Sequence, residues 1–428
     1  MGNEKDIMTA NKVCEKNGIS FYYIHSDKFK TISLNVIFAT ALKKKLTTCN
    51  ALIPHILKRG CRSYPTQQEL AIRLEELYGM SLNGSVDKKG ENQLVRFHAG
   101  FASGRYTADR TKLFDEAGDL LLEVLTQPVL ESGSFKKDYI EQERENLIQR
   151  IRSRVNNKMS YSMHRCLEEM CKGEPFEVYE DGDEENAKAI TASELMDGYQ
   201  ELLKKYPVFV YISGDVSEDE MKRFIDKFDS IERENIQPLT EPSFNKKRDE
   251  PLRIEEPMDV SQGKLCLGFR THIKANSPDY FPLAIYNGIL GGGVHSKLFK
   301  NVREKESLAY SAFSLLERYK GLLVACSGIE IADREKTEKI ILDQIKAINS
   351  GDISETEMEA TKKSFETGLK IMQDSQEGIV DFYLSQHISG INESIDEFYN
   401  KLMSVKKDDV IKMSEMITLD TTYFLTSL

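Results

Sequence analysis

The chain has 428 residues, enough for two or three domains at roughly 150 residues each, and its hydrophobic fraction of 40% can fill a core in each of them. It holds 58 basic and 69 acidic residues, a net charge of -11, which argues against a protein that binds nucleic-acid phosphates through clustered Lys and Arg. The composition therefore excludes a disordered chain and disfavours a nucleic-acid partner.

Cysteine usage and hydropathy indicate a cytoplasmic protein. The seven cysteines are scattered and include no Cys-x-x-Cys pair, so we expect neither a disulfide framework nor a thiolate zinc site. Residues 1–18 are polar and charged and lack the apolar segment of a signal peptide. The longest apolar run, Leu34–Leu42, is far shorter than the ~20 residues that cross a bilayer, so no membrane partner is expected.

The first half of the chain shows signals for both strands and helices. Two runs rich in aromatic and β-branched residues between Gly18 and Leu42 predict adjacent strands. Ser/Thr-x-x-Glu boxes that begin at Thr66, Thr191 and Ser217 each predict the start of a helix. The other predicted elements are helices over Asn50–Lys58, Thr111–Thr126 and Phe135–Met170 and strands over Ser81–Val86, Gln93–Phe101 and Val208–Ser213.

The second half repeats the first. Leu265–Gly293 reads as a strand, a polar loop, a helix and a glycine stop, in the same order as Leu34–Gly60. A strand-turn-strand pattern follows, and helices are expected over most of 333–417, one of them capped at Ser354.

The repeat predicts two homologous domains of the α+β class, each a mostly antiparallel sheet packed with helices. Residues 232–258 hold four of the 11 prolines among many charged residues, which predicts a linker. The domains are therefore expected at 1–231 and 259–428. A single large domain is the alternative.

The helix expected at Asn50–Lys58 contains an incomplete zinc motif. An H-x-x-E-H sequence holds zinc with two imidazoles one turn apart, and its Glu activates the metal-bound water. The corresponding residues here are Ala51, Pro54 and His55, so one ligand and the base are absent. A single imidazole cannot hold tetrahedral zinc, and His55 is expected to be an ordinary packed histidine.

The surroundings of this helix resemble the insulinase/pitrilysin-like metallopeptidase family, the inverted-motif zincins, over nearly the whole chain. The resemblance is closest to a zinc-less bacterial branch associated with elongation factor P modification. The matching segments are the paired-strand opening, KRG at 58–60, LYG at 77–79, PVL at 128–130 and the Glu-rich stretch 135–151. The second half contributes ILGGGVHSKLFKNVREKESLAYS at 289–311, which is very close to the second-domain signature of the family.

The resemblance implies that the third metal ligand of the family has also been lost. The third zinc ligand of the family is a Glu on the helix that corresponds to 135–151. Alignment on Glu143 and Arg144 places Arg150 at that position, while Gln149 and Glu145 remain alternatives. The chain is therefore expected to bind no cofactor itself.

The resemblance also implies a role for two residues of the second half. In catalytic members, an Arg and a Tyr of the second-domain signature hydrogen-bond the substrate carbonyl and the developing oxyanion, which stabilises the transition state electrostatically. Here they are Arg303 and Tyr310. The alternative is a solvated Arg and a packed Tyr. The glycines at 291–293 lack a phosphate-loop motif and are expected to end a helix.

These features together predict half of a split active site. The family builds its chamber from four such domains, so the length implies a second chain, a zinc-bearing sibling that completes a heterodimeric peptidase. The substrate would be an extended peptide held by strand addition. One alternative is a pseudo-peptidase that binds peptides or acts as a scaffold without cleaving them. A further alternative is a homodimer with a metal-independent mechanism.

Overall fold

The computed structural model describes residues 8–107, 112–244 and 248–428 and divides into two compact units. Each unit includes a segment from the other half of the sequence, so compactness divides the chain differently from the predicted sequence boundaries at 231 and 259. Unit 1 comprises Met1–Arg152, Val178–Thr240 and Gln373–Ile388, and unit 2 comprises Ser153–Glu177, Glu241–Met372 and Ser389–Leu428.

Unit 1 is built on a sheet whose strand order is β1-β2-β8-β3-β5-β4 and in which only β2 and β8 pair in parallel. The strands are β1 (Ala10–Lys16), β2 (Ile19–His25), β3 (Thr31–Ala41), β4 (Ser81–Lys89), β5 (Asn92–Ala102) and β8 (Val208–Gly214). The helices are α1 (Lys44–Leu57), α2 (Gln67–Glu76), α3 (Leu113–Thr126), α4 (Lys137–Ser153), α6 (Glu184–Ala189), α7 (Ala192–Lys205), α8 (Glu218–Lys227) and α12 (Gln376–Ile388).

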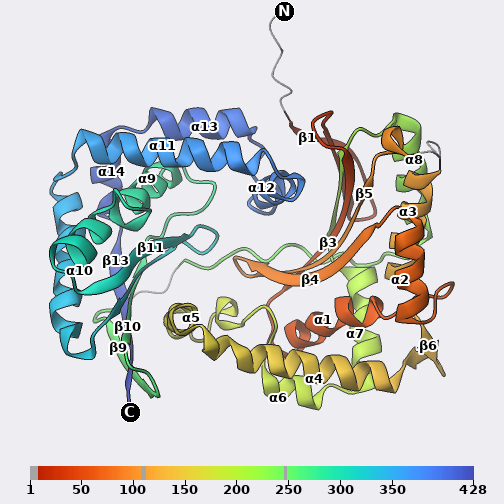
Figure 1. Cartoon of the computed structure of the whole chain (residues 1–428), viewed down its shortest axis with the longest axis horizontal. Helices are drawn as coiled ribbons and strands as arrows, with labels where there is room; N and C mark the ends of the chain where they lie inside the picture. The colour runs from red at the N-terminus through yellow and green to blue at the C-terminus, as the bar shows by residue number, and fades with distance from the viewer. Residues whose placement is uncertain (1–7, 108–111, 245–247) are drawn as a thin grey trace, which may run out of the picture. The chain divides into compact units, whose positions relative to one another are not determined.

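The two faces of this sheet differ in polarity because side chains alternate along each strand. Val36 and Phe97 belong to the apolar face, which packs with α1, α3 and α8. The opposite face presents Tyr211, Arg96 and His98, and these residues contact α12. Figure 1 shows α12 on one side of the sheet and α3 and α8 on the other.

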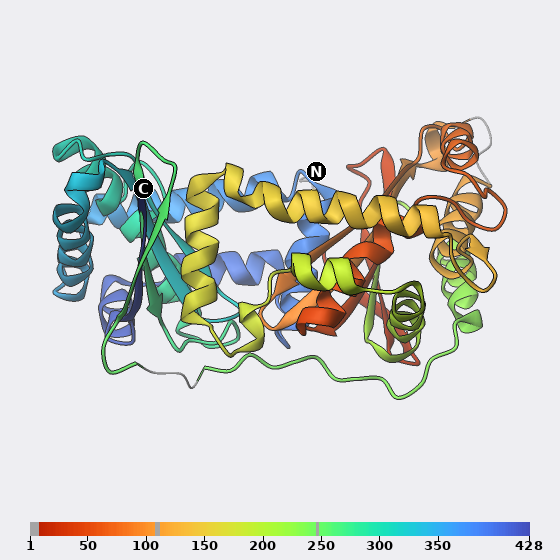
Figure 2. The same cartoon turned by 90° about the horizontal axis from the view of Figure 1, so that it is seen from below.

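Unit 2 is built on a sheet in the order β11-β12-β10-β13-β9, in which only β13 and β9 pair in parallel. Figures 1 and 2 show α5 on one side of this sheet and α10 on the other. The strands are β9 (Leu252–Met258), β10 (Gly263–Arg270), β11 (Ala309–Glu317), β12 (Leu322–Ile329) and β13 (Thr418–Ser427). The helices are α5 (Lys158–Met170), α9 (Tyr280–Gly291), α10 (Arg334–Asn349), α11 (Glu355–Met372), α13 (Ile395–Ser404) and α14 (Lys407–Ser414), with a π-helical segment at Phe299–Lys305.

The predicted α+β repeat is present in both units. Strand order β2-β8-β3-β5-β4 in unit 1 corresponds to β9-β13-β10-β12-β11 in unit 2, with the same single parallel pair. In chain order, α1 corresponds to α9 and α4 to α11. The next helix in the chain, α5 after α4 and α12 after α11, belongs in each case to the opposite unit from the helix before it and packs on the sheet of its own unit. None of the described helices has both the length and the apolar content needed to span a bilayer.

Most predicted elements are confirmed, and the boxes at Thr66, Thr191 and Ser217 each cap a helix through paired side-chain and backbone hydrogen bonds. The single helix expected over Phe135–Met170 is wrong. It is two helices, because the Asn157 side chain accepts a hydrogen bond from the Ser160 N–H at 3.1 Å and starts α5 anew.

Further differences concern the ends of elements and strands that were not predicted. The helix expected from Asn50 begins at Lys44, and β1 was not predicted. The last seven residues of the predicted linker form β9, an edge strand that tolerates Pro257. The C-terminal strand β13 was not predicted. The expected helix start at Thr111, like residues 1–7 and 245–247, lies outside the described residues.

A buried ionic cluster fixes the segment 153–177 in unit 2. Arg270 of β10, with a side chain 4% exposed, donates to Asp420 at 2.8 Å and to Glu174 at 2.8 Å. The fully buried Lys320 ammonium lies 2.6 Å from the other Glu174 oxygen. The two cations are thus balanced by two carboxylates, one of which belongs to the segment from the first half of the sequence.

We expect Arg270→Met to destabilise unit 2, because Asp420 would keep a buried charge without this partner. The loss should be about 3–5 kcal/mol, measured from urea unfolding. Lys339→Met is the matched control, since Lys339 and Asp343 are 78% and 41% exposed in their pair in unit 2, and it should cost less than about 1 kcal/mol. Equal unfolding midpoints for the two variants would contradict this account.

Candidate functional site

The degenerate zinc-motif positions lie on α1, which packs against the edge strand β4. Ala51 and Pro54 are buried, and His55 is partly buried in the last turn of the helix. Gly84 of β4 allows this packing, because a Cβ at that position would lie 2.8 Å from the Pro54 Cβ. The positions that would carry a ligand and the base are therefore filled by groups that pack and cannot coordinate.

The positive charge of Arg150, on α4, lowers the pKa of His55. Burial, then the positive charges of Arg150 and Lys58, lower the pKa of His55 to about 4. The Arg150 Nε lies 3.2 Å from Asp181 Oδ1, which orients the guanidinium. His55 is consequently neutral at physiological pH, beside a fixed cation.

The two alternative third-ligand positions lie elsewhere on α4. Glu145 and Gln149 are exposed, and Gln149 Nε2 donates to Glu145 Oε1 at 3.1 Å. Glu143 is buried and accepts a hydrogen bond from Arg59 Nε at 2.6 Å. Of the three candidate positions, Arg150 is the one with an electrostatic effect on His55.

These residues do not fit a zinc ion. A methyl group, a pyrrolidine ring and a guanidinium replace an imidazole and two carboxylates, and a guanidinium repels a cation. Across the described parts of the chain, no three His, Cys, Asp or Glu side chains are grouped so that they could hold a metal ion.

Arg303 and Tyr310 lie together in unit 2. Arg303 lies on the π-helical segment Phe299–Lys305. The chain then turns at Ser307, which has a φ of 52°, and enters β11, which contains Tyr310. The Arg303 guanidinium carbon lies 4.7 Å from the Phe299 ring centroid and 5.5 Å from that of Tyr310. Such cation–π contacts contribute about 0.5–1 kcal/mol each at exposed sites, and they hold the guanidinium between two rings.

Both side chains are open to a ligand. Tyr310 is 81% exposed and Arg303 is also exposed. Within residues 8–107, 112–244 and 248–428, neither side chain makes a hydrogen bond or an ion pair. Their polar donors are therefore available to an oxygen atom supplied from outside the chain.

A pocket of about 540 Å³ lies farther along β11. Its walls are the end of α9 with the glycine loop, the β11 residues 313–315, and α11 from Thr361 to Leu369. Gly291 is needed here, because a Cβ would lie 2.2 Å from the Ser314 backbone nitrogen. His295 shares a hydrogen bond of 3.0 Å with Thr361. No charged side chain lines the pocket, so it suits an apolar group.

Sequence reasoning missed several features of these sites. The pocket and the Phe299 contact could not be found because they join residues from separate elements. Lys58 could have been singled out, since it is the last residue of the predicted helix that carries His55. The expected helix end at the triple glycine is confirmed by α9, which ends at Gly291.

The chain is similar to a known protein family, to two proteins of Bacillus subtilis and to a solved structure. The family described as "Peptidase M16 inactive domain" matches residues 189–365. "Probable inactive metalloprotease YmfF" of Bacillus subtilis is 37% identical, over 97% of this chain and 98% of that protein. "Uncharacterized zinc protease YmxG" of the same bacterium is 21% identical, over 94% of each. A crystal structure of a conserved protein from Enterococcus faecalis superposes with a TM-score of 0.91 at 27% identity, over 98% and 99% of the chains.

The pKa of His55 provides a test of the site. An NMR titration, with the His55 signal assigned by its loss in His55→Gln, should give a midpoint near 4. Arg150→Gln should raise the midpoint only in part, because burial is the larger cause. The folded pKa lies below the ordinary value of about 6.5, so the stability from neutral His55 is present above that pH and is lost as pH falls through about 4. A midpoint near 6.5 in the wild type would contradict this arrangement.

Proposed function

The chain belongs to the M16, insulinase-type peptidase family as an inactive, zinc-less homologue, and on this premise we propose that it is the carbonyl-binding subunit of a heterodimeric zinc peptidase. The partner would be a family sibling that carries the intact zinc motif and holds the metal. The observation that carries the proposal is the pairing of Arg303 with Tyr310, whose donors have no partner within the described residues.

In this proposal, Arg303 and Tyr310 contribute hydrogen bonds to the substrate carbonyl. When bound, the partner's zinc would supply the activated water that attacks the peptide carbonyl. The Arg303 guanidinium and the Tyr310 hydroxyl would donate hydrogen bonds to the carbonyl oxygen as negative charge develops on it. The Phe299 ring keeps the guanidinium in place before the substrate arrives, so less orientation is needed in the transition state.

The names of the relatives support such a division of labour. Bacillus subtilis has both a relative named as an inactive metalloprotease and one named as a zinc protease. An intracellular setting for the complex, with a short peptide or unfolded segment as its substrate, is part of the same proposal.

A pseudo-peptidase that binds peptides without cleaving them is the second candidate, and the pocket beside β11 favours it. β11 is an edge strand, so an extended peptide could pair with it and insert an apolar side chain into the pocket. Phe313 lies three residues beyond Tyr310, roughly 10 Å along the strand. The two candidates differ only in whether a partner's metal acts on the bound peptide.

The first test mixes this chain with a purified zinc-motif sibling and measures peptide cleavage. Neither chain alone should be active, and the mixture should be. Arg303→Ala or Tyr310→Phe should each lower kcat of the mixture by about 10²–10³-fold, the usual cost of one oxyanion donor. Lys305→Ala, an exposed neighbour on the same segment, is the control and should leave kcat unchanged. Cleavage that survives both variants would refute the carbonyl-binding role.

The second test fills the pocket. Gly368 lines it, and a Cβ there would meet no atom within 4 Å, so Gly368→Leu should fold normally and occupy the space. Binding of a leucine-containing peptide, followed by fluorescence anisotropy, should weaken about tenfold. Thr367→Leu, an exposed neighbour outside the pocket, should bind as the wild type does. Unchanged affinity for Gly368→Leu would show that the pocket takes no part in binding.

A further inference from the structure

Arg150, at the third-ligand position, and Lys58, which ends α1, give the degenerate zinc site of unit 1 a positive charge. Lys58 and Arg150 both act on His55, and together they lower its pKa further than burial alone. Two carboxylates act on His55 in the opposite direction, Glu143, which pairs with Arg59, and Asp181, which pairs with Arg150. Lys58 is left as the cation that these pairs do not balance.

Lys58 is placed as a ligand-binding group would be. It is partly buried at the C-terminal end of α1, and burial lowers its pKa while the charge of Glu143 acts in the opposite direction. Its ammonium makes no hydrogen bond or ion pair with any residue that the structure describes. A partly buried cation without a partner is costly, and an anion bound beside it would offset that cost.

Arg150 and His55 provide hydrogen-bonding groups beside the charge of Lys58. Arg150 is oriented by Asp181 and its side chain is 37% exposed, so the guanidinium can donate a charge-assisted hydrogen bond to a carboxylate. His55 is neutral at physiological pH, so it offers a hydrogen bond to a ligand without adding charge. The three side chains thus combine a cation that makes no hydrogen bond or ion pair within the described residues, a cation oriented by Asp181, and one neutral polar group.

The adjacent strand favours a peptide over a small free anion. β4 packs against α1 and forms the end of its sheet, pairing with β5 alone among the described strands. Its outer backbone groups are therefore open to a chain in extended conformation. The approach of Pro54 to Gly84 brings the end of α1 close to this edge.

The internal repeat provides a comparison within the same chain. The equivalent place in unit 2, between α9, β11 and α11, is the pocket of about 540 Å³, and no Lys, Arg, Asp or Glu lines it. The same position of the fold is thus apolar in one unit and cationic in the other. The charge in unit 1 is a property of Lys58 and Arg150 and not a requirement of the fold.

We propose that Lys58 at the end of α1 and Arg150 of α4, which both act on His55, form a binding site for a peptide carboxylate where zinc-bearing relatives hold their metal. The site belongs to this chain alone and does not depend on a partner subunit or on Arg303 and Tyr310. It can therefore fail or succeed independently of the proposed peptidase role.

The test compares a fluorescein-labelled peptide of about eight Ala, Ser, Val and Thr residues with its C-terminal amide. Anisotropy on the full chain should show the free acid binding about tenfold more tightly than the amide at low salt. The preference should fall below about twofold in Lys58→Gln with Arg150→Gln, because both charges are lost. An amidated peptide with one internal Glu tells the two carboxylate sources apart: tight binding of that peptide assigns the site to acidic side chains.

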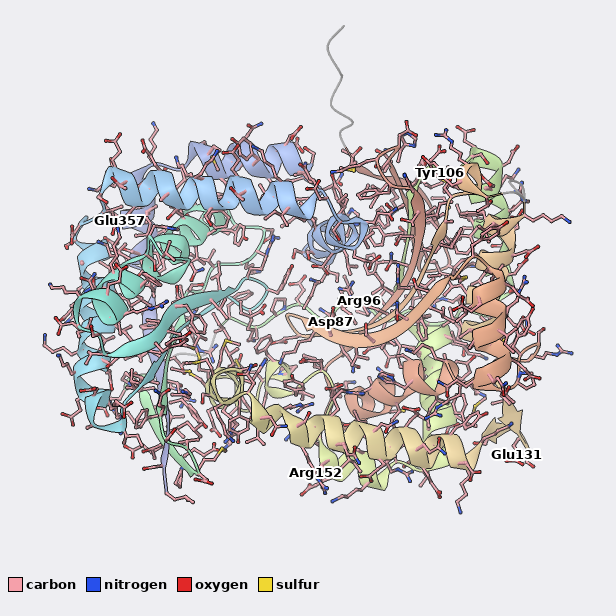
Figure 3. The ribbon with its side chains drawn as sticks, viewed as in Figure 1. Asp87, Arg96, Tyr106, Glu131, Arg152 and Glu357 are labelled. Carbon is pink, nitrogen blue, oxygen red and sulfur yellow. The ribbon has the colours of Figure 1, made fainter. Side chains whose placement is uncertain are left out.

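Arg152→Gln is the matched control. Arg152 lies on the same helix as Arg150, 58% exposed and paired with Glu184, and Figure 3 shows it on the outer side of α4. This variant should keep the full preference for the acid. Lys58→Gln alone, at a helix end, serves if the double variant unfolds, and it should reduce the preference at least threefold. Equal binding of acid and amide by the wild type, or a preference that survives loss of both cations, would overturn the proposal.

Discussion

The ion pairs around Arg270 impose the constraint on which unit 2 depends. Arg270 and Lys320 are buried in the sheet region of unit 2, and one of the two carboxylates that balance them is Glu174. Glu174 comes from the first half of the sequence, so residues 259–428 alone would leave buried positive charge uncompensated. The segment 153–177 is therefore required for the charge balance of unit 2.

The reciprocal segment in unit 1 is also held by carboxylates that pair with basic side chains of the sheet. Asp381 of α12 pairs with Arg96 and Lys89, and Glu377 pairs with His98. Arg96 also pairs with Asp87 on the neighbouring strand, and Figure 3 shows these two side chains together. The polar face of this sheet thus finds its partners on a helix from the second half. By contrast, α5 covers an apolar face lined by Cys266, Cys326 and Tyr423.

The two halves have diverged most where the family places its chemistry. The corner formed by the repeat helix, the edge strand and the long helix is present in both units. In unit 1 it contains His55, Lys58 and Arg150, and in unit 2 it is an uncharged pocket. Arg303, on the π-helical segment, and Tyr310, on β11, come before the β11 residues that line that pocket.

The sequence by itself determined the α+β class, the internal repeat and the helix starts at Thr66, Thr191 and Ser217, because these follow from local periodicity and capping groups. It also determined that Ala51 and Pro54 cannot serve a metal, since side-chain chemistry alone decides that. Only the tertiary structure decided that α5 and α12 belong to opposite units. The physical reason is that this outcome depends on charge balance and face polarity between segments up to hundreds of residues apart. The meeting of Arg150 with His55 is of the same kind, because it requires α1 and α4 to pack together.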